Sequence, residues 1–116
     1  MAYEKVCAVD EVPGDEALAV TIGDLELAIA RDGDEIFAVQ NVCSHAEVAL
    51  SEGEVVDGTV ECWLHGSCFD LRTGKPTHLP ATEPVATFAV EVRPAPDGGA
   101  DVYVDASETL NGVRPS

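Results

Sequence analysis

Two short segments of the chain each place a cysteine close to a histidine. The first segment is Cys43-Ser44-His45 and the second is Cys62-Trp63-Leu64-His65, with sixteen residues between His45 and Cys62. In each segment the two side chains are near enough in sequence to reach one metal centre. The pair Asp57-Gly58, a strong hairpin signal, lies between the segments and can fold them side by side.

Two thiolates and two imidazoles suit an iron–sulfur centre that has two cysteines on one iron and two histidines on the other. The same four ligands also suit a tetrahedral zinc site. Zinc sites usually take both cysteines from one short motif and both histidines from another, whereas each segment here supplies one of each. This mixed order favours the iron–sulfur centre and leaves zinc as the alternative.

The elements that must position these segments are predicted to be strands. Alternating or continuous apolar runs, bounded by Gly and Asp turn signals, recur about every ten residues, which predicts an all-β fold. Two polar stretches, residues 10–16 and 47–52, have room for a turn of helix. The predicted strands cover residues 17–22, 25–30, 35–40, 54–56, 59–62, 86–92 and 101–104, and Cys7 lies in a further strand near the N-terminus.

Length, charge and cysteine content limit the function classes. A chain of 116 residues supports one domain, and its net charge of −16 disfavours nucleic acid and anionic membranes as partners. No apolar run approaches the ~20 residues of a membrane span, and no leader pattern opens the chain. We therefore expect a cytoplasmic monomer whose four cysteines are thiols or metal ligands rather than disulfides.

The pattern C-x-H followed by C-x-x-H, continued by Gly66 and Ser67, resembles the signature of the Rieske family. This resemblance implies one [2Fe-2S] cluster, with Cys43 and Cys62 on one iron and His45 and His65 on the other. It also implies a Rieske fold, in which an antiparallel β-sandwich base carries a small cluster-binding β subdomain.

The domain limits follow from the same resemblance. Residues 1–106 are expected to form a single Rieske domain, with the cluster-binding subdomain at about 41–84. The segment His78-Leu79-Pro80-Ala81-Thr82 resembles the proline-bearing loop that covers the cluster in this family. Residues 107–116 have little core-forming content, so we expect a loosely held C-terminal tail.

Size decides among the roles known in this family. The chain is too short to include the mononuclear-iron domain of a terminal oxygenase, and it lacks the membrane anchor of a respiratory subunit. It resembles the ferredoxin component of bacterial aromatic-ring-hydroxylating dioxygenases, which is not itself an enzyme. Such a component carries single electrons from a flavin-dependent ferredoxin reductase to a terminal Rieske oxygenase.

Two alternatives stay open. One is a Rieske ferredoxin associated with iron–sulfur cluster assembly, which the run from Glu61 to Gly74 also resembles. The other is a protein like the small subunit of nitrite reductase, although many such subunits lack the ligands that are present here.

Departures from the high-potential respiratory members concern the redox potential. Val48 and Leu64 stand where those proteins have a disulfide, and Phe69 stands where they have a tyrosine that donates to a ligand sulfur. Ser67 matches a serine that donates to a bridging sulfide. One donor instead of two predicts a potential near the low end of the Rieske range, roughly −150 to 0 mV.

Four further side chains invite less specific interpretations. Cys7 and Cys68 are expected to be small buried hydrophobic residues, and His78 is expected to be exposed and to have no role in the redox chemistry. Trp63 is expected to shield the cluster or to contact a partner. Leu79, with Val48, Leu64 and Trp63, completes a set of candidate apolar contacts around the cluster.

Overall fold

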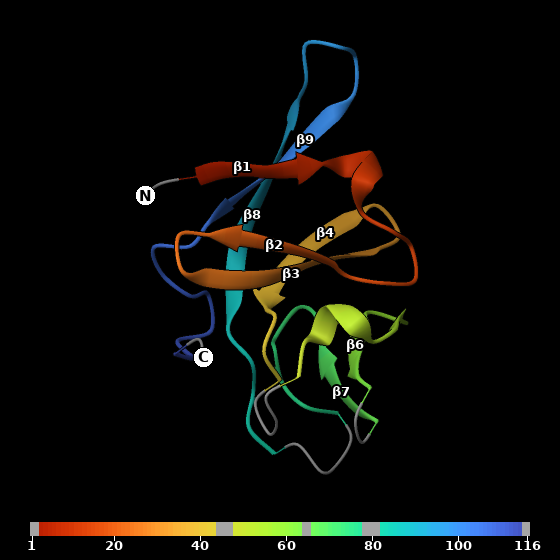
Figure 1. Cartoon of the computed structure of the whole chain (residues 1–116), viewed down its shortest axis with the longest axis vertical. Coiled ribbons are helices and arrows are strands. Elements are labelled where there is room, and N and C mark those ends of the chain that lie inside the picture. Colours follow the sequence, from red (N-terminus) through yellow and green to blue (C-terminus); the bar gives the residue numbers. More distant parts are fainter. Residues whose placement is uncertain (1–2, 44–47, 64–65, 78–81, 115–116) are drawn as a thin grey trace.

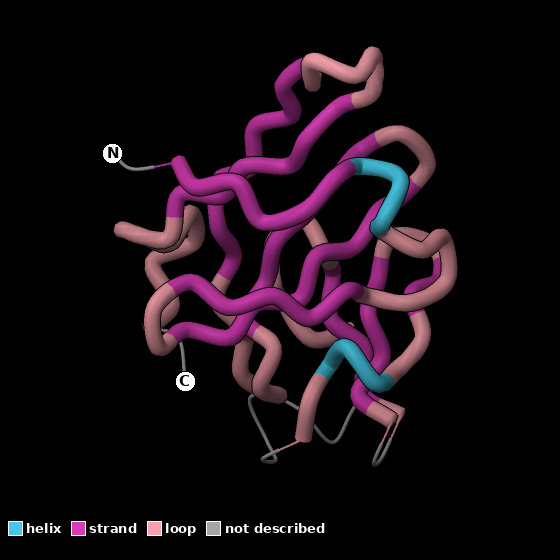
Figure 2. The backbone as a smooth tube through the Cα atoms, turned by 45° about the horizontal axis from the view of Figure 1, so that its top comes forward, coloured by secondary structure: helices cyan, strands magenta, loops and turns pink. Residues whose placement is uncertain are grey.

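The structure is a computed structural model that describes residues 3–43, 48–63, 66–77 and 82–114. Within these ranges the chain consists of strands and loops, with two short 3-10 helices at Val9–Glu11 and Leu50–Glu52 (Figure 2). The predicted all-β fold is confirmed, and both helices overlap the polar stretches where a helical turn was predicted. Within the described ranges, no helix has the length and apolar character that a membrane crossing requires.

The described residues form nine strands, which largely follow the predicted ones. The strand at 35–40 matches its prediction at both ends, and so does the strand at 59–62, whereas Ser67–Asp70 was not predicted. The strands are β1 (Tyr3–Ala8), β2 (Leu18–Ile22), β3 (Leu25–Asp32), β4 (Glu35–Gln40), β5 (Val55–Val56), β6 (Thr59–Cys62), β7 (Ser67–Asp70), β8 (Thr87–Pro94) and β9 (Ala100–Asp105).

Six of these strands form a large antiparallel sheet in the order β1-β9-β8-β4-β3-β2. The two ends of the chain meet in it, because β1 pairs with β9. The sheet curls so that its end strands, β1 and β2, approach each other (Figure 1). This curled sheet is the predicted antiparallel base.

The other three strands form a small antiparallel sheet in the order β5-β6-β7 at one end of the molecule (Figure 1). Its first hairpin turns at the predicted pair, Asp57 and Gly58, whose φ angles are 51° and 77°. Two consecutive positive φ angles match the twist of a two-residue hairpin turn, and Asp-Gly tolerates them. The Asp57-Gly58 pair therefore predicted this turn correctly.

Strand β3 connects two hydrophobic cores, because successive side chains of a strand point to opposite faces. Leu27 and Ile29 are buried in the core of the large sheet, together with side chains such as Phe88. Ala28 and Ala30 are buried in a second core, which lies between β3 and the small sheet. Strand β3, which lies next to the end strand β2 of the base, thus also forms the surface on which the small sheet packs.

The C-terminal segment contacts the rest of the chain, which differs from the loosely held tail that we expected. The Leu110 N–H donates to the Thr87 carbonyl at 2.8 Å. Val113 packs against the core of the large sheet, and the Asn111 side chain forms hydrogen bonds with Val85 and Thr87. Residues 110–113 are therefore part of the fold.

Candidate metal centre

Cys43 lies just after β4, on a short ladder that leads away from the large sheet. Its backbone N–H donates to the Val48 carbonyl at 3.0 Å, and Val42 forms an isolated antiparallel bridge with Ala49. Only 3% of the Cys43 surface is exposed. This ladder brings Cys43 next to Val48 and leaves the cysteine buried.

Cys62 ends β6 and stands opposite Ser67, the first residue of β7. The Gly66 N–H donates to the Cys62 carbonyl at 3.0 Å, so the chain reverses direction within four residues. The φ of Gly66 is +75°, a backbone conformation that glycine adopts without strain. Cys62 is fully buried.

Both cysteines belong to the second core, although nineteen positions separate them in the sequence. This core surrounds them with apolar side chains from the 3-10 helix Leu50–Glu52, from the small sheet, and from the segments that follow β7 and precede β8: Leu50, Val55, Val60, Phe69, Leu71 and Val85. No disulfide joins any of the four cysteines. Two cysteines without a disulfide, buried in one apolar core, fit the thiolate half of a [2Fe-2S] site, because a buried thiolate needs a metal to balance its charge.

The two histidines expected to complete the site, His45 and His65, lie outside the described residues, as does His78. Within the described part of the chain, no three His, Cys, Asp or Glu side chains gather as a metal site would require. The structure thus brings together the two predicted cysteines and leaves the histidine ligands as a prediction.

Ser67 and Phe69, the two residues expected to influence the redox potential, both belong to the small sheet. Both are fully buried on β7. Ser67 is the cross-strand partner of Cys62, and Phe69 is the partner of Val60 on the same pair of strands. A hydroxyl therefore sits beside one cysteine, and a benzyl group without a hydroxyl fills the adjoining core.

The remaining two cysteines are protonated thiols at neutral pH. Burial, reinforced by the carboxylates of Glu11 and Asp101, raises the pKa of Cys7 to about 11. Burial and the facing Glu61 also raise the pKa of Cys68. Cys7 is buried as predicted, whereas Cys68 is only partly buried, because it lies on the outer face of β7.

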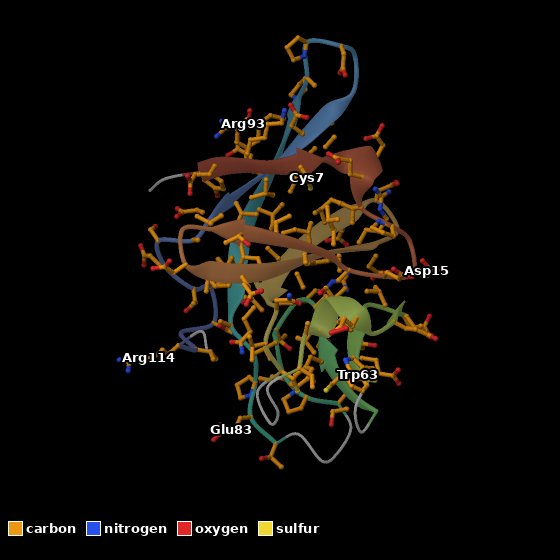
Figure 3. The ribbon with its side chains drawn as sticks, viewed as in Figure 1. Cys7, Asp15, Trp63, Glu83, Arg93 and Arg114 are labelled. Carbon is orange, nitrogen blue, oxygen red and sulfur yellow. The ribbon has the colours of Figure 1, made fainter. Side chains whose placement is uncertain are left out.

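Trp63, which directly follows Cys62, is a large apolar side chain that is exposed. Half of its surface (49%) is open to solvent, and Figure 3 shows it at the end of the molecule that carries the small sheet. Val48 is instead partly buried and packs against the second core. Leu64 and Leu79, the other two candidate contacts, lie outside the described residues.

Two buried amides that the sequence analysis missed hold the first loop in place. Gln40 donates from Nε2 to the Val42 carbonyl at 2.6 Å, and it is 1% exposed. Asn41 accepts from the Ser51 N–H at 2.8 Å through Oδ1. These hydrogen bonds link the end of β4 to the residues before and after Cys43. The one signal in the sequence that could have indicated Gln40 and Asn41 is their position shortly before the cysteine.

An arginine joins the second loop region to the base. Arg72 follows β7, and its Nη2 lies 3.1 Å from Asp32 Oδ2 and 2.9 Å from Glu35 Oε1, at the turn between β3 and β4. Its guanidinium carbon lies 4.8 Å from the centre of the Phe37 ring. The two carboxylates raise the pKa of Arg72. No sequence signal indicated this contact, since about forty residues separate the partners.

Comparison with known proteins agrees with this geometry. Residues 2–89 match the Rieske [2Fe-2S] domain. The chain is 44% identical over 97 residues to the anthranilate 1,2-dioxygenase ferredoxin subunit of Burkholderia cepacia, covering 84% of this chain and 87% of that protein. It is 42% identical over 105 residues to the ferredoxin component of biphenyl 2,3-dioxygenase from Rhodococcus jostii, covering 90% and 94%.

Among solved structures, the chain is similar to one in a complex of reduced oxygenase and oxidised ferredoxin of carbazole 1,9a-dioxygenase. The TM-score is 0.81 at 35% identity, and the match covers 93% of this chain and 96% of the other. The chain therefore belongs to the Rieske [2Fe-2S] domain family, in which it is an electron carrier of the ferredoxin type with one [2Fe-2S] cluster.

Proposed function

We propose that Cys43, His45, Cys62 and His65 hold the cluster, with the cysteines on one iron and the histidines on the other. The observation that carries this assignment is the burial of Cys43 and Cys62 in one apolar core, each at the edge of the loop that contains its histidine. When bound, such a cluster supplies reversible one-electron chemistry. The cluster-binding region would then span about residues 41–84.

The chain's own residues exclude water from the sulfur side of the site. Leu50, Val60 and Phe69 are fully buried around the two cysteines. A low local dielectric strengthens every hydrogen bond aimed at the sulfurs, including the one proposed for Ser67. The side chains of the base and the small sheet thus influence the redox potential of the cluster. The partly exposed Trp63 lies where a partner protein would approach.

We further propose that this carrier takes electrons from a flavin-dependent ferredoxin reductase and passes them to a terminal Rieske oxygenase that hydroxylates an aromatic ring. Relatives that match over nearly their full length are named as ferredoxin components of aromatic dioxygenases, which supports this pairing. The similar solved chain is a ferredoxin in complex with an oxygenase. Monomeric state and cytoplasmic location remain predictions, and size-exclusion chromatography tests the first.

Reconstitution with candidate partners tests the pairing. Under anaerobic conditions, stopped-flow mixing of the reduced protein with an oxidised oxygenase should oxidise the carrier within one turnover of the oxygenase. With a net charge of −16, the rate should fall as salt rises, because a Debye length of about 8 Å at physiological ionic strength screens long-range steering. Failure to reduce any ring-hydroxylating oxygenase, with efficient transfer to a cluster-assembly protein instead, would overturn the proposal.

A further inference from the structure

Residues 85–87, which lead into β8, are buried and have every backbone hydrogen-bonding group satisfied. Residues 85 and 86 are fully buried, and Thr87 is 2% exposed. Gln40 forms hydrogen bonds with both backbone groups of Ala86. Its side-chain Oε1 accepts the Ala86 N–H at 2.7 Å, and its backbone N–H donates to the Ala86 carbonyl at 2.9 Å. One end of β4 therefore fixes the middle of this short segment.

Asn111, in the C-terminal tail, forms hydrogen bonds with Val85 and Thr87, the residues on either side of Ala86. Asn111 Nδ2 donates to the Val85 carbonyl at 2.8 Å, and its Oδ1 accepts the Thr87 N–H at 3.3 Å. The same Nδ2 donates to the Thr73 carbonyl at 3.0 Å. One amide side chain thus bonds to two separate stretches of chain, the turn after β7 and the start of β8.

Close packing at Gly74 shows how tightly these stretches are held. The Val85 N–H donates to the Gly74 carbonyl at 2.8 Å. A Cβ added at Gly74 would lie 2.1 Å from the Val85 carbonyl oxygen and 2.7 Å from Asn111 Nδ2. Both distances are far shorter than a real contact, so the three groups meet only because residue 74 has no side chain.

Residues 85–87 contact the core around the two cysteines through the side chain of Val85. Val85 is fully buried in the same core as Cys43 and Cys62. Its backbone oxygen is bonded to Asn111 and its side chain packs in that core. A displacement of residue 85 would therefore open the apolar wall around the two cysteines.

We propose that Asn111 is a positioning residue for the metal centre, which holds residues 73–74 against residues 85–87 and so keeps the core around the cysteines closed to water. This inference rests on the proposed role of Cys43 and Cys62 as cluster ligands. It makes the C-terminal tail a functional part of the electron carrier, although the tail lies more than forty residues beyond the last proposed ligand.

Two variants of the iron-loaded, full-length protein test the proposal. Asn111→Ala removes all three hydrogen bonds to the neighbouring segments. Asn111→Asp keeps the acceptor for the Thr87 N–H but sets carboxylate oxygen against the carbonyls of Thr73 and Val85. Arg114→Gln is the matched control for Asn111→Asp, because both variants lower the net charge by one unit. Arg114 is an exposed side chain of the same tail, and Figure 3 shows it pointing away from the body of the protein.

Each net hydrogen bond contributes a factor of roughly 2 to 10 to an equilibrium constant. We therefore expect Asn111→Ala to lose its cluster to a chelator about tenfold faster than wild type, and Asn111→Asp at least as fast. Arg114→Gln should match wild type. Hydrogen exchange should accelerate at the amides of Val85 and Thr87 and stay unchanged at the amide of Ala28 in β3.

The reduction potential supplies a readout that loss of stability alone would not move. Reduction adds a negative charge to the cluster, and water near it favours the more charged form. We expect both Asn111 variants to shift the redox equilibrium twofold to tenfold toward the reduced state, a rise of about 20–60 mV.

Unchanged cluster loss and unchanged amide exchange in both variants would overturn the inference while leaving the proposed ligands intact. Equal acceleration of exchange at Ala28 and Val85 would also overturn it, because that result means general destabilisation. A wild-type protein that binds no cluster would instead overturn the proposed function, whatever the Asn111 variants do.

Discussion

The large and small sheets hold together in different ways. Strands of the large sheet run for five to eight residues, whereas those of the small sheet run for two to four. A three-stranded sheet of that length is marginal without packing on another element. The small sheet gains that packing from the face of β3 that carries Ala28 and Ala30 and from Leu50. We therefore expect the small sheet to depend on the base for its stability more than the base depends on the small sheet.

The contents of the two cores show the same contrast. The core of the large sheet is built from aliphatic and aromatic side chains, and its one cysteine, Cys7, has a raised pKa and behaves as a small hydrophobe. The second core contains the two proposed cluster ligands, Cys43 and Cys62. Without iron, that core would hold two polarisable thiols in place of bonds to metal. If Cys43 and Cys62 hold the cluster as proposed, the stability of this region will depend on the cofactor.

Removing a cysteine ligand should give the largest difference between the two regions. We expect Cys43→Ala or Cys62→Ala to abolish the cluster and to accelerate hydrogen exchange in β6 and β7 more than about a hundredfold, while β3 keeps most of its protection. Cys7→Ser is the control, since it changes a buried cysteine of the base and should leave the visible spectrum of the cluster intact. Equal loss of protection in both sheets would contradict the contrast.

Two fully buried leucines allow a matched comparison of the cores, Leu27 in the base and Leu50 beside the cysteines. Leu→Ala in a core costs about 2–5 kcal/mol. For Leu27→Ala we expect that loss in the free energy of global unfolding, measured by denaturant titration. Leu50→Ala should show it mainly as faster cluster loss to a chelator. If Leu50→Ala lowers global stability as much as Leu27→Ala does and releases the cluster no faster, the two cores are not separable.

A smaller effect concerns the reduction potential. A hydrogen bond from Ser67 favours the reduced cluster by about 1–2 kcal/mol more than the oxidised one, so Ser67→Ala should lower the potential by roughly 40–90 mV. Phe69→Tyr should raise it by a similar amount, because the new hydroxyl would enter the core that contains both cysteines. Protein-film voltammetry measures both shifts. Cys68→Ser, on the outer face of the same strand, should leave the potential unchanged. If Cys68→Ser shifts the potential as much as Ser67→Ala does, the shift does not come from a hydrogen bond between Ser67 and the cluster.

The smallest expected effect is at the contact between the two regions. Arg72 is exposed and pairs with Asp32 and Glu35 across the boundary. Since exposed ion pairs contribute little and are screened by salt, Arg72→Met should only slightly increase hydrogen exchange in β7 at low salt. At high salt the variant and the wild type should become indistinguishable. A large effect that persists at high salt would mean that packing of Arg72 on Phe37 holds the small sheet in place.

Features with a local cause were predictable from the sequence. The Asp57-Gly58 turn follows from the two residues that form it, and the paired Cys and His spacing marks the site because each loop is short. Strand β7 was missed because its four residues become a strand only by pairing with β6. The contacts of Gln40 with Ala86 and of Asn111 with Thr73 were also invisible, since 46 and 38 positions separate the partners. Long-range polar contacts of this kind leave no periodic pattern in a sequence.

The most direct test of the central claim is pulsed EPR on the dithionite-reduced protein, grown with and without ¹⁵N-labelled histidine. If His45 and His65 bind one iron of a [2Fe-2S] cluster, the spectrum will show strong couplings from two histidine nitrogens, and these couplings will change with the label. Because nitrogen replaces sulfur on that iron, the average g value should also lie below that of an all-cysteine cluster. A reduced signal without histidine couplings, or a protein that contains zinc and no labile sulfide, would contradict the account.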